Sequence, residues 1–544
     1  MFAGIDLADE NVPEATTLLK RLCLSGHIHR NRCSITSSSG EPRHFACKAG
    51  DCSIDQRFPL VARVVSSTAS ENAKIANDSN MNVDSYDKLQ AALLCGHIDA
   101  CSAFLASRHE SDKGSAEYWY WLAQMYYRSG RFLDALDICF KLTREAGAFG
   151  MHFHCLADIC AHLGLKDVGL SGLEMLASKA QIGNASSYYV RLCGNHYLGE
   201  DDAVLLVQRD TSVPESCMNE HFRARSVMRS RSITAGVQAF HRTYCSLTAV
   251  AELWPAQDLG HYWCGQHELP KRLTVKGFSC GFGDFIQWVR YARALQALGV
   301  EVDCDAAFHG LTGDFGISER DRQFADRLRD VGFVCGRNDT HMWTSPFALF
   351  ASLFPALEYG ATDRYLVSRE DEQVEQMMGE IRRRAQGRRC VGIFWSSCES
   401  DNLYAHRSLR REHLAPLWEA TDDIHWIVMQ RGYERTRWAD SPYSKDPRRC
   451  TILPTQTSLA QVIGIIDRLD GFVGNDGALS HAAGALNRPG YLLLNSRCAD
   501  WRYELNMDTT PWYPSLKVLR PDTMGDWGTL TTKLISSVEG WITR

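Results

Sequence analysis

A glycine-rich segment that ends in a carboxylate offers the clearest chemistry in the sequence. It spans residues 276–287 and contains Gly281, Gly283, Asp284 and Gln287. Glycines let a backbone turn tightly and approach a ligand, and the first turn of a helix presents N–H groups without intrahelical acceptors. A carboxylate placed there can act as a general base, or it can cap its helix in a purely structural role. The residue types alone leave both roles open for Asp284.

A second small-residue turn occurs later in the chain, at residues 473–485. It contains Asp476, Gly477, Ala478 and, one helical turn further on, His481. The dipole and the N–H groups of a helix start attract anions, so this turn suits a phosphate-bearing ligand. Taken alone, His481 is better explained as a hydrogen-bonded core histidine.

Both turns fall within alternating strands and helices. After about residue 265, short β-branched and aliphatic runs are followed by helical segments, first at 272–302 and again at 389–494. This alternation predicts parallel sheets, and we expect two Rossmann-like lobes at 265–380 and 381–544. The arginines at 382–384 should lie near the hinge. In such folds ligands bind at the carboxyl ends of the strands, so both turns should face one cleft.

The segment before the lobes has a helical repeat. Gly96, Gly130 and Gly164 are spaced by 34 residues, and Gly199 falls near the next expected place. This period, with a helix on each side of the glycine, resembles the tetratricopeptide repeat, and we place the repeats at 84–210. Such an array offers a concave surface for a protein partner or acceptor, or it serves as a spacer or a dimerisation element. We expect residues 1–83 to be an irregular extension and residues 211–264 to be a connecting region.

Taken together, the two turns resemble a known family. Segments 281–287 and 476–489 are similar to the heptosyltransferase-like glycosyltransferases of family 9, and most of all to large bacterial proteins that carry tetratricopeptide repeats before that module. The resemblance covers about 270–522 and, more loosely, the repeats. Further matching stretches are 391–396, 404–409, 430–432, 500–502 and 511–514.

The resemblance implies a GT-B fold, with the acceptor and the base in the first lobe and the nucleotide-sugar in the second. By position, Asp284 matches the catalytic aspartate, which would take the acceptor's proton and give inversion. Gly281, Gly283 and Gln287 would belong to the acceptor loop around it. The donor site would comprise Asp476, His481 and the backbone N–H groups of Gly477 and Ala478.

A departing nucleoside diphosphate needs positive charge fixed in advance. Arg407 is our candidate, His406 is a weaker second, and Arg410 and Arg411 are rivals. Ser396, at the end of a predicted strand, would also contact the donor. The chain departs from the family at Phe282, where a smaller or aliphatic residue is usual, and at Gly477, where Thr or Ser is frequent, so the donor sugar cannot be inherited from the heptose-transferring members.

We therefore predict an inverting glycosyltransferase that moves a sugar from a nucleotide-diphosphate donor to a hydroxyl on a protein, a glycan or a lipid-linked saccharide. The nucleotide-sugar is a co-substrate, and the expected mechanism uses no metal and no other cofactor. The alternative is a tetratricopeptide scaffold whose GT-B module only binds a nucleotide-sugar or a protein partner. Retention of Asp284 together with the donor-site acid and histidine favours the enzyme.

Composition excludes other classes of function. The chain has 544 residues, 45% of them hydrophobic and 23% charged, and no apolar run long enough to span a bilayer. Its net charge of -6 argues against a nucleic-acid partner bound by broad phosphate neutralisation. The N-terminus is acidic and lacks the features of a secretory signal, so we expect a cytoplasmic protein.

Weaker patterns carry structural alternatives. The triplet Asp303-Cys-Asp305 has the Asp-x-Asp pattern that can bind a divalent metal ion. Two acids in three positions also arise easily by chance. The N-terminal cysteines and histidines between Cys23 and Cys52 lack the paired short spacings of zinc modules, so an irregular extension is the preferred interpretation. The aromatic residues at 118–121 and 126–127 are expected to pack between repeats.

Overall fold

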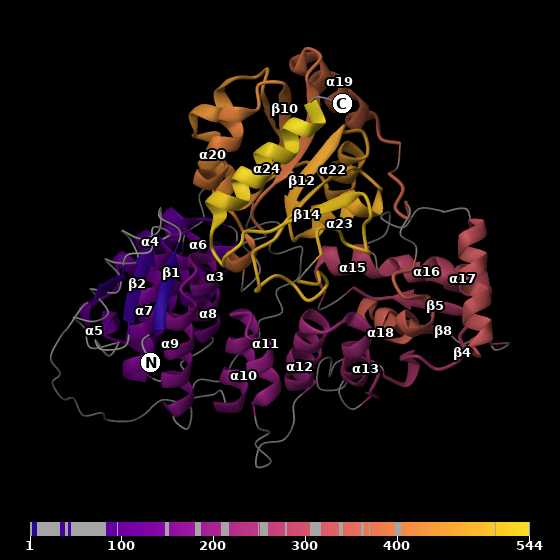
Figure 1. Ribbon diagram of the computed structural model, residues 1–544, viewed down its shortest axis with the longest axis horizontal. Coiled ribbons are helices and arrows are strands. Elements are labelled where there is room, and N and C mark those ends of the chain that lie inside the picture. Colours follow the sequence, from indigo (N-terminus) through magenta and orange to yellow (C-terminus); the bar gives the residue numbers. More distant parts are fainter. Residues whose placement is uncertain are drawn as a thin grey trace.

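The computed structural model describes residues 83–542, apart from short gaps, and three strands within the first 44 residues. The gaps are 95, 147–151, 180–186, 208–216, 248–249, 251–258, 278–279, 305–316, 337–340, 361–363, 369, 398–403 and 506. Figure 1 shows a helical region at the lower left and bottom, one α/β lobe beside it at the lower right, and a second α/β lobe above. Among the described residues, no helix is both long and apolar enough to cross a membrane.

The N-terminal strands form a small sheet of their own. In it β1 (Ala3–Leu7) runs parallel to β2 (Cys33–Ser37), which pairs antiparallel with β3 (Pro42–His44). The expected irregular extension therefore contains regular structure at these three places.

The helical region consists of consecutive helices packed side by side (Figure 1). The helices are α3 (Tyr86–Leu94), α4 (Ile98–Ala106), α5 (Glu110–Lys113), α6 (Ala116–Arg128), α7 (Phe132–Ala146), α8 (His152–Leu163), α9 (Lys166–Lys179), α10 (Ser187–Tyr197), α11 (Asp201–Leu206), α12 (Cys217–Ser230) and α13 (Ile233–Tyr244). The repeat glycines Gly96, Gly130, Gly164 and Gly199 each join two of these helices with φ between 70° and 80°. This left-handed conformation strains any residue with a Cβ atom, which explains the spacing seen in the sequence.

The region at 211–264, expected to be a connection, adds the further helical pair α12 and α13, which pack on each other. The turn between them contains Arg231 and Ser232 rather than a glycine. Ser232 caps α13 by accepting a hydrogen bond from the N–H of Ala235. Because its turn lacks the glycine that marks the earlier turns, this helical pair was not predicted.

The second lobe is built on a six-stranded parallel sheet in the order β11-β10-β9-β12-β13-β14. In chain order this arrangement is 3-2-1-4-5-6, so the topological switch point lies between β9 and β12. The strands are β9 (Arg389–Phe394), β10 (Ile424–Val428), β11 (Cys450–Ile452), β12 (Gly471–Asn475), β13 (Gly490–Leu493) and β14 (Leu516–Leu519). The helices are α19 (Glu372–Ala385), α20 (Arg411–Ala420), α21 (Gly432–Ala439), α22 (Leu459–Ile466), α23 (Ala478–Ala485) and α24 (Trp527–Ile542).

The first lobe is smaller. Its parallel sheet has the order β6-β5-β8, and β4 pairs with β7 beside it. The strands are β4 (Glu268–Leu269), β5 (Arg272–Val275), β6 (Glu301–Cys304), β7 (Val334–Cys335) and β8 (His341–Thr344). The helices are α15 (Phe282–Trp288), α16 (Ala292–Leu298), α17 (Glu319–Asp330) and α18 (Pro346–Leu357), with the 3-10 turn η3 (Val289–Tyr291) after α15. Helix α19 falls within the range expected for this lobe, but it packs on α22 and β9 of the second lobe.

One hydrophobic core joins all three parts of the chain. Trp288 of the first lobe stacks on Trp501 of the second, with ring centroids 5.9 Å apart, and Phe240 of α13 lies 5.4 Å from the same Trp501 ring. All three side chains are buried. Because large aromatic side chains contribute much of the free energy gained on burial, this cluster fixes the two lobes and α13 against one another.

Candidate functional site

Asp284 lies in the first turn of α15, which follows strand β5 in the first lobe. Its Oδ2 accepts a hydrogen bond of 3.0 Å from the N–H of Gly281, so the side chain does cap its own helix. Its Oδ1 forms an ion pair with Arg502 of the second lobe. The Asp284 side chain remains 24% exposed.

The helix starts of the two lobes touch beside Asp284. A Cβ atom added to Gly283 would lie 2.7 Å from Cδ2 of His481 and 3.4 Å from the Cα of Ala478. These two residues belong to α23, which begins after Gly477. Only glycine allows this approach, so the turns at 276–287 and 473–485 meet, as predicted, at the carboxyl ends of strands from both lobes.

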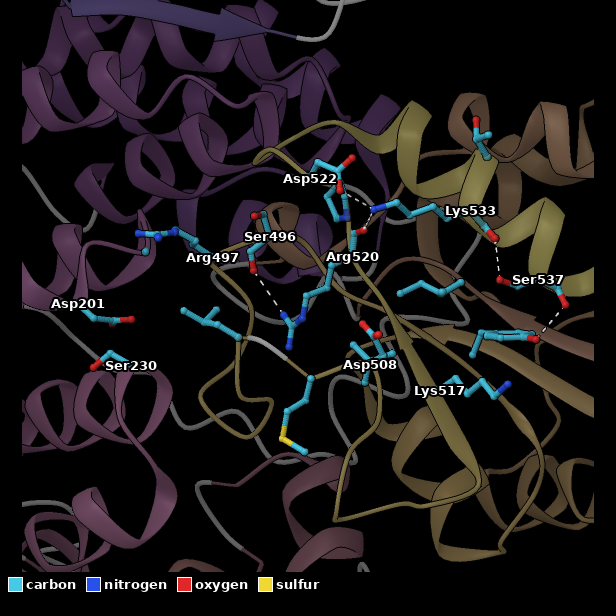
Figure 2. Close-up of a pocket in the computed structure, with 18 of the residues that line it drawn as sticks. Asp201, Ser230, Ser496, Arg497, Asp508, Lys517, Arg520, Asp522, Lys533 and Ser537 are labelled. Atoms are coloured by element: carbon cyan, nitrogen blue, oxygen red, sulfur yellow. Dashed lines mark hydrogen bonds and ion pairs between the residues drawn. The ribbon is translucent and has the colours of Figure 1, made fainter.

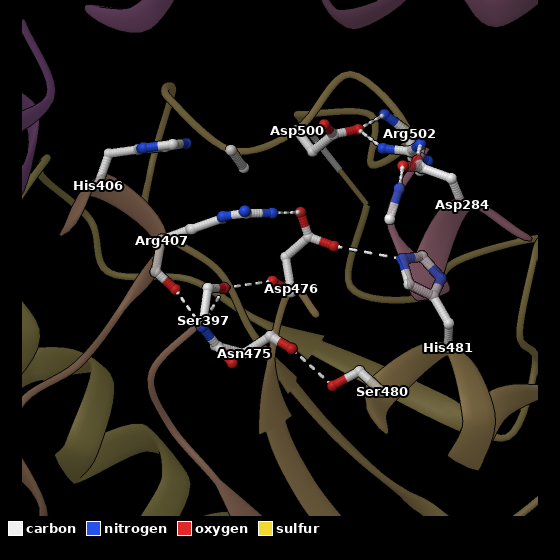
Figure 3. A network of polar contacts seen from close by, with 12 residues as sticks. Asp284, Ser397, His406, Arg407, Asn475, Asp476, Ser480, His481, Asp500 and Arg502 are labelled. Atoms are coloured by element: carbon white, nitrogen blue, oxygen red, sulfur yellow. Dashed lines mark hydrogen bonds and ion pairs between the residues drawn. The ribbon is translucent and has the colours of Figure 1, made fainter. Parts of the chain in front are cut away.

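Asp476 follows β12 directly and occupies the switch point of the second lobe (Figure 3). Its Oδ2 lies 3.8 Å from Nη1 of Arg407, and its Oδ1 lies 3.6 Å from Nε2 of His481. The hydroxyl of Tyr503 donates to the same Oδ1 at 3.2 Å. Arg407 and His481 therefore flank one buried carboxylate, and the N-terminal N–H groups of α23 lie in the same turn.

Burial sets the protonation of this group of residues. Burial raises the pKa of Asp476, the nearby Asp500 raises it further, and Arg407 and Arg502 oppose the increase. Burial also lowers the pKa of His481 well below its ordinary value, and the positive charge of Arg502 adds to this decrease. His481 is therefore neutral at pH 7.

A chain of hydroxyl groups sets the tautomer of the neutral His481. Arg290 of the first lobe, which can only donate, gives a hydrogen bond of 3.0 Å to the hydroxyl of Tyr365. Tyr365 donates at 3.4 Å to the hydroxyl of Tyr513, which lies 2.9 Å from Nδ1 of His481. Following the protons along this chain, Nδ1 accepts and Nε2 carries the proton, which directs an N–H group toward Asp476.

Ser396 and its neighbour differ in their roles. The predicted residue, Ser396, is buried, and Gln430 holds its backbone by accepting from its N–H and donating to its carbonyl, both at 3.0 Å. The side chain that joins the two strand ends belongs to Ser397, whose hydroxyl donates to the carbonyl of Asp476 at 2.9 Å. Asn475 donates at 3.1 Å to the same hydroxyl. Ser397 and Asn475 were missed because serine and asparagine after a strand are common turn residues.

Two other predicted residues lie in unexpected surroundings. His406 pairs through Nδ1 with Asp158 of the helical region, so this ring atom is engaged away from Asp476. Gln287 is fully buried on α15, and neither of its amide atoms has a hydrogen-bond partner among the described residues. Arg407 is thus the member of the pair at 406–407 that extends toward the buried acid (Figure 3).

Arg502 and Asp500 also belong to the site, although neither was a predicted site residue. Arg502 bridges Asp284 and Asp500, with Nη1 2.8 Å from Oδ1 of Asp500. Burial alone would raise the pKa of Asp500, but Arg502 and Arg225 of α12 hold it below its ordinary value. The available signal was the matching stretch at 500–502, which places an acid and an arginine two residues apart.

A hollow of about 1260 Å³ lies elsewhere, between the α10–α11 turn, β14 and α24 (Figure 2). Its lining carries charges of both signs, including Arg497, Lys517 and Asp508, and Lys533 pairs with Asp522 at 2.6 Å. None of the predicted site residues lines it. It is therefore separate from the contact between the two lobes.

The weaker metal patterns fall largely outside the described part of the chain. Asp303 lies on β6, whereas Asp305 is not among the described residues. Of the N-terminal cysteines and histidines, Cys33 lies on β2 and His44 lies on β3. The others are not among the described residues. Within the described residues, no three His, Cys, Asp or Glu side chains gather as a metal ion would require.

Two parallel α/β lobes whose helix starts meet at their switch points define a GT-B-like arrangement, preceded here by a helical region. Residues 433–492, which run from α21 to β13 and include Asp476 and His481, match the model of Glycosyltransferase family 9 (heptosyltransferase). Comparison with curated protein sequences gives no match.

Solved structures show a distant likeness. An ADP-heptose LPS heptosyltransferase II from E. coli is 15% identical, with 49% of this chain and 99% of that chain covered and a TM-score of 0.32. The E. coli heptosyltransferase WaaC with ADP-2-deoxy-2-fluoro heptose is 15% identical, with 50% and 99% covered and a TM-score of 0.29. An O-GlcNAc transferase from Thermobaculum terrenum is 12% identical, with 80% and 94% covered and a TM-score of 0.26.

Proposed function

We propose that the protein is an inverting glycosyltransferase that transfers a sugar from a nucleoside diphosphate sugar to a hydroxyl group. The observation that carries this proposal is the contact between Gly283 and His481, which brings the carboxylate of Asp284 beside the buried donor-type residues of the other lobe. The family 9 match supports it, because residues 433–492 contain Asp476 and His481.

In the proposed reaction, the acceptor oxygen attacks the anomeric carbon while the bond from that carbon to the diphosphate oxygen breaks. Asp284 takes the proton of the acceptor hydroxyl as general base. The nucleoside diphosphate leaves with additional negative charge, which Arg407 and the N–H groups at the start of α23 stabilise. Attack from the side opposite the leaving group inverts the anomeric centre.

We propose that turnover needs no metal ion, since positive charge is available within the site itself. Arg407 lies 3.8 Å from Asp476, and Arg502 lies between Asp284 and Asp500. Guanidinium groups supply the charge compensation that a divalent cation would otherwise give to a departing diphosphate. Undiminished turnover in EDTA is the expected result. The acceptor is a protein that the tetratricopeptide-like surface would hold, a glycan or a lipid-linked saccharide.

One observation favours the alternative of a scaffold that binds a nucleotide-sugar without turnover. Both carboxylate oxygens of Asp284 are engaged in the structure, Oδ2 by Gly281 and Oδ1 by Arg502. In that case Asp284 stabilises the contact between the lobes and accepts no proton from a substrate.

A panel of ADP-, UDP-, GDP- and dTDP-sugars separates the two functions. We expect hydrolysis or transfer with one donor in the wild type, and a decrease of about 100-fold or more in Asp284→Asn with donor binding retained. Asp303→Asn, which changes an acid on the next strand of the same lobe, is the matched control and should keep wild-type turnover. Binding with equal, slow turnover in all three proteins would support the scaffold.

A further inference from the structure

The turn that carries Arg407 is held by the helical region through its N–H groups. The N–H of Tyr404 donates to the hydroxyl of Tyr127 at 2.9 Å. The N–H groups of Ala405 and His406 donate to Oδ2 and Oδ1 of Asp158, at 2.9 and 3.0 Å. Three successive backbone donors of the second lobe therefore end on two side chains of α6 and α8.

The carbonyl groups of the same turn, η5 (Ala405–Arg407), are fixed as well. The carbonyl of Ala405 accepts from Nδ1 of His162 at 2.8 Å. The carbonyl of His406 accepts from Nδ2 of Asn495 at 2.9 Å, and that of Arg407 accepts from Nδ2 of Asn475 at 2.7 Å. The first of these donors lies on α8, the second follows strand β13, and the third is the last residue of β12. The backbone before Arg407 is thus held in one conformation by the helical region and the sheet together.

Asp158 is the centre of this arrangement. It is fully buried, and its two oxygens also accept from the hydroxyl of Tyr127 and pair with Nδ1 of His406. Burial alone would raise the pKa of Asp158, but His406 and the other hydrogen-bond donors hold it below its ordinary value. Donors therefore converge on both oxygens of one ionised carboxylate, a pattern that an amide side chain cannot reproduce because its nitrogen donates.

We infer that Asp158 is a positioning residue for Arg407, so that the helical region contributes to the donor site as well as offering a surface. This inference rests on the proposed function, in which Arg407 stabilises the departing diphosphate. Asp158 acts through the η5 backbone, because its contacts are with Ala405 and His406 and not with the site's acid. A long arginine side chain needs a fixed backbone to keep its guanidinium in place before the reaction.

A second link supports an integral role for the helical region. Arg225 of α12 donates to Oδ2 of Asp500 at 2.8 Å, and Asp500 in turn holds Arg502 beside Asp284. Contacts from α8 and from α12 thus reach the two arginines of the site by separate routes.

A double-mutant cycle on the whole 544-residue chain tests the inference. The probes are ADP, UDP and GDP in calorimetric titrations and the matching nucleotide-sugars in turnover assays. We expect Asp158→Asn to weaken nucleoside diphosphate binding and to lower kcat/KM about 10-fold in the wild-type background. In an Arg407→Met background the same substitution should have no further effect, because the group it positions is gone.

Two further variants control for folding. Leu176 of α9 is buried in the hydrophobic core of the helical region, so Leu176→Ala opens a cavity there. This variant should lower the melting temperature without changing nucleotide affinity. Tyr127→Phe removes the hydroxyl that donates to Asp158 and accepts from the N–H of Tyr404. It should decrease the affinity less than Asp158→Asn, and it replaces that variant in the test if Asp158→Asn does not fold. An unchanged affinity in Tyr127→Phe would then count against the positioning role.

The outcomes separate the two levels of the proposal. A wild-type chain that neither binds nor turns over any of the probes overturns the proposed function and the inference built on it. Binding and turnover in the wild type, with multiplicative effects of Asp158→Asn and Arg407→Met, would overturn only the positioning role. An effect of Asp158→Asn that disappears in the Arg407→Met background supports it.

Discussion

Arg502 of the second lobe forms an ion pair with Asp284 at the start of α15 in the first lobe. The same guanidinium contacts Asp500, and it lies over the Trp501 ring at 4.9 Å from the centroid. One buried cation therefore joins the proposed base to the lobe that would bind the nucleotide. The free energy of the contact between the lobes and the charge at the site depend on the same side chain.

Replacing this cation should destabilise the fold. Arg502→Met leaves Asp284 and Asp500 without their shared partner, and breaking a buried ion pair typically costs about 3 to 5 kcal/mol. Chemical denaturation in urea measures the change. Arg383→Met, which removes an exposed arginine paired with Glu380, is the control and should leave the midpoint unchanged. Equal midpoints for the two variants would contradict the structural role of Arg502.

Glycine substitutions test the contact between the helix starts. A Cβ atom at Gly283 would lie 2.7 Å from the ring of His481, so Gly283→Ala should force the lobes apart and lower turnover about 10-fold or more. At Gly281 the nearest atom to an added Cβ is Oδ2 of Asp284 at 3.5 Å, an ordinary contact. Gly281→Ala should therefore keep most of the activity. Measuring kcat/KM for both variants under the same conditions tests the contact between the helix starts. A larger decrease in Gly281→Ala than in Gly283→Ala would refute the proposed geometry.

The hydroxyl chain to His481 predicts an effect on donor binding. Tyr513→Phe removes the hydroxyl 2.9 Å from Nδ1 of His481, so the ring is no longer held with its proton on Nε2. Loss of one hydrogen bond of this kind corresponds to about a 5-fold increase in donor KM. Tyr491→Phe removes a hydroxyl that donates to Ser537 at a distant site, and its KM should stay at the wild-type value. Steady-state kinetics that show the same KM for both variants would refute a role for the hydroxyl chain.

Acid should weaken the attachment of the helical region. Burial lowers the pKa of His162 from 6.5 to about 4, with Arg410 and His406 adding to the decrease and Ala405 and Asp158 opposing it. Because the folded-state pKa is depressed, this group's stabilisation is complete above pH 6.5 and is lost as the pH falls toward 4. At about 1.4 kcal/mol per pH unit, the loss approaches 3 kcal/mol over that window.

Melting temperatures recorded across that pH range, for the wild type and for His162→Asn, measure this contribution. The asparagine keeps an N–H donor for the Ala405 carbonyl but does not titrate. We expect a shallower decrease for the variant than for the wild type. Parallel curves would show that the acid sensitivity arises at other buried histidines, such as His154.

The sequence predicted the arrangement of the two lobes where local signals were strong. The glycines at 96, 130, 164 and 199 and the turns before Asp284 and His481 each combine a conformational requirement with a fixed spacing, so their positions could be recognised. The helical pair α12 and α13 has no glycine turn and was missed. The family of the helical repeat and the catalytic role of Asp284 stay predictions.

The remaining site residues depend on contacts between distant parts of the chain. The pairing of Asp158 with His406 joins residues 248 positions apart, and that of Asp284 with Arg502 joins residues 218 apart. No local pattern contains such partners. His406 looked like a donor ligand because it precedes Arg407, and only the packing of α8 on η5 shows that its Nδ1 is committed to the helical region.

The helical region is attached to both α/β lobes. Helix α8 contacts the second lobe through η5, and α13 packs on α18 of the first lobe, where Tyr244 stacks on Phe347 with centroids 4.7 Å apart. Any change in the angle between the lobes must therefore change how the helices from α8 to α13 are arranged. A ligand that stiffens or straightens this arc would change the affinity for the proposed nucleotide, and that nucleotide would change the affinity for the ligand by the same factor.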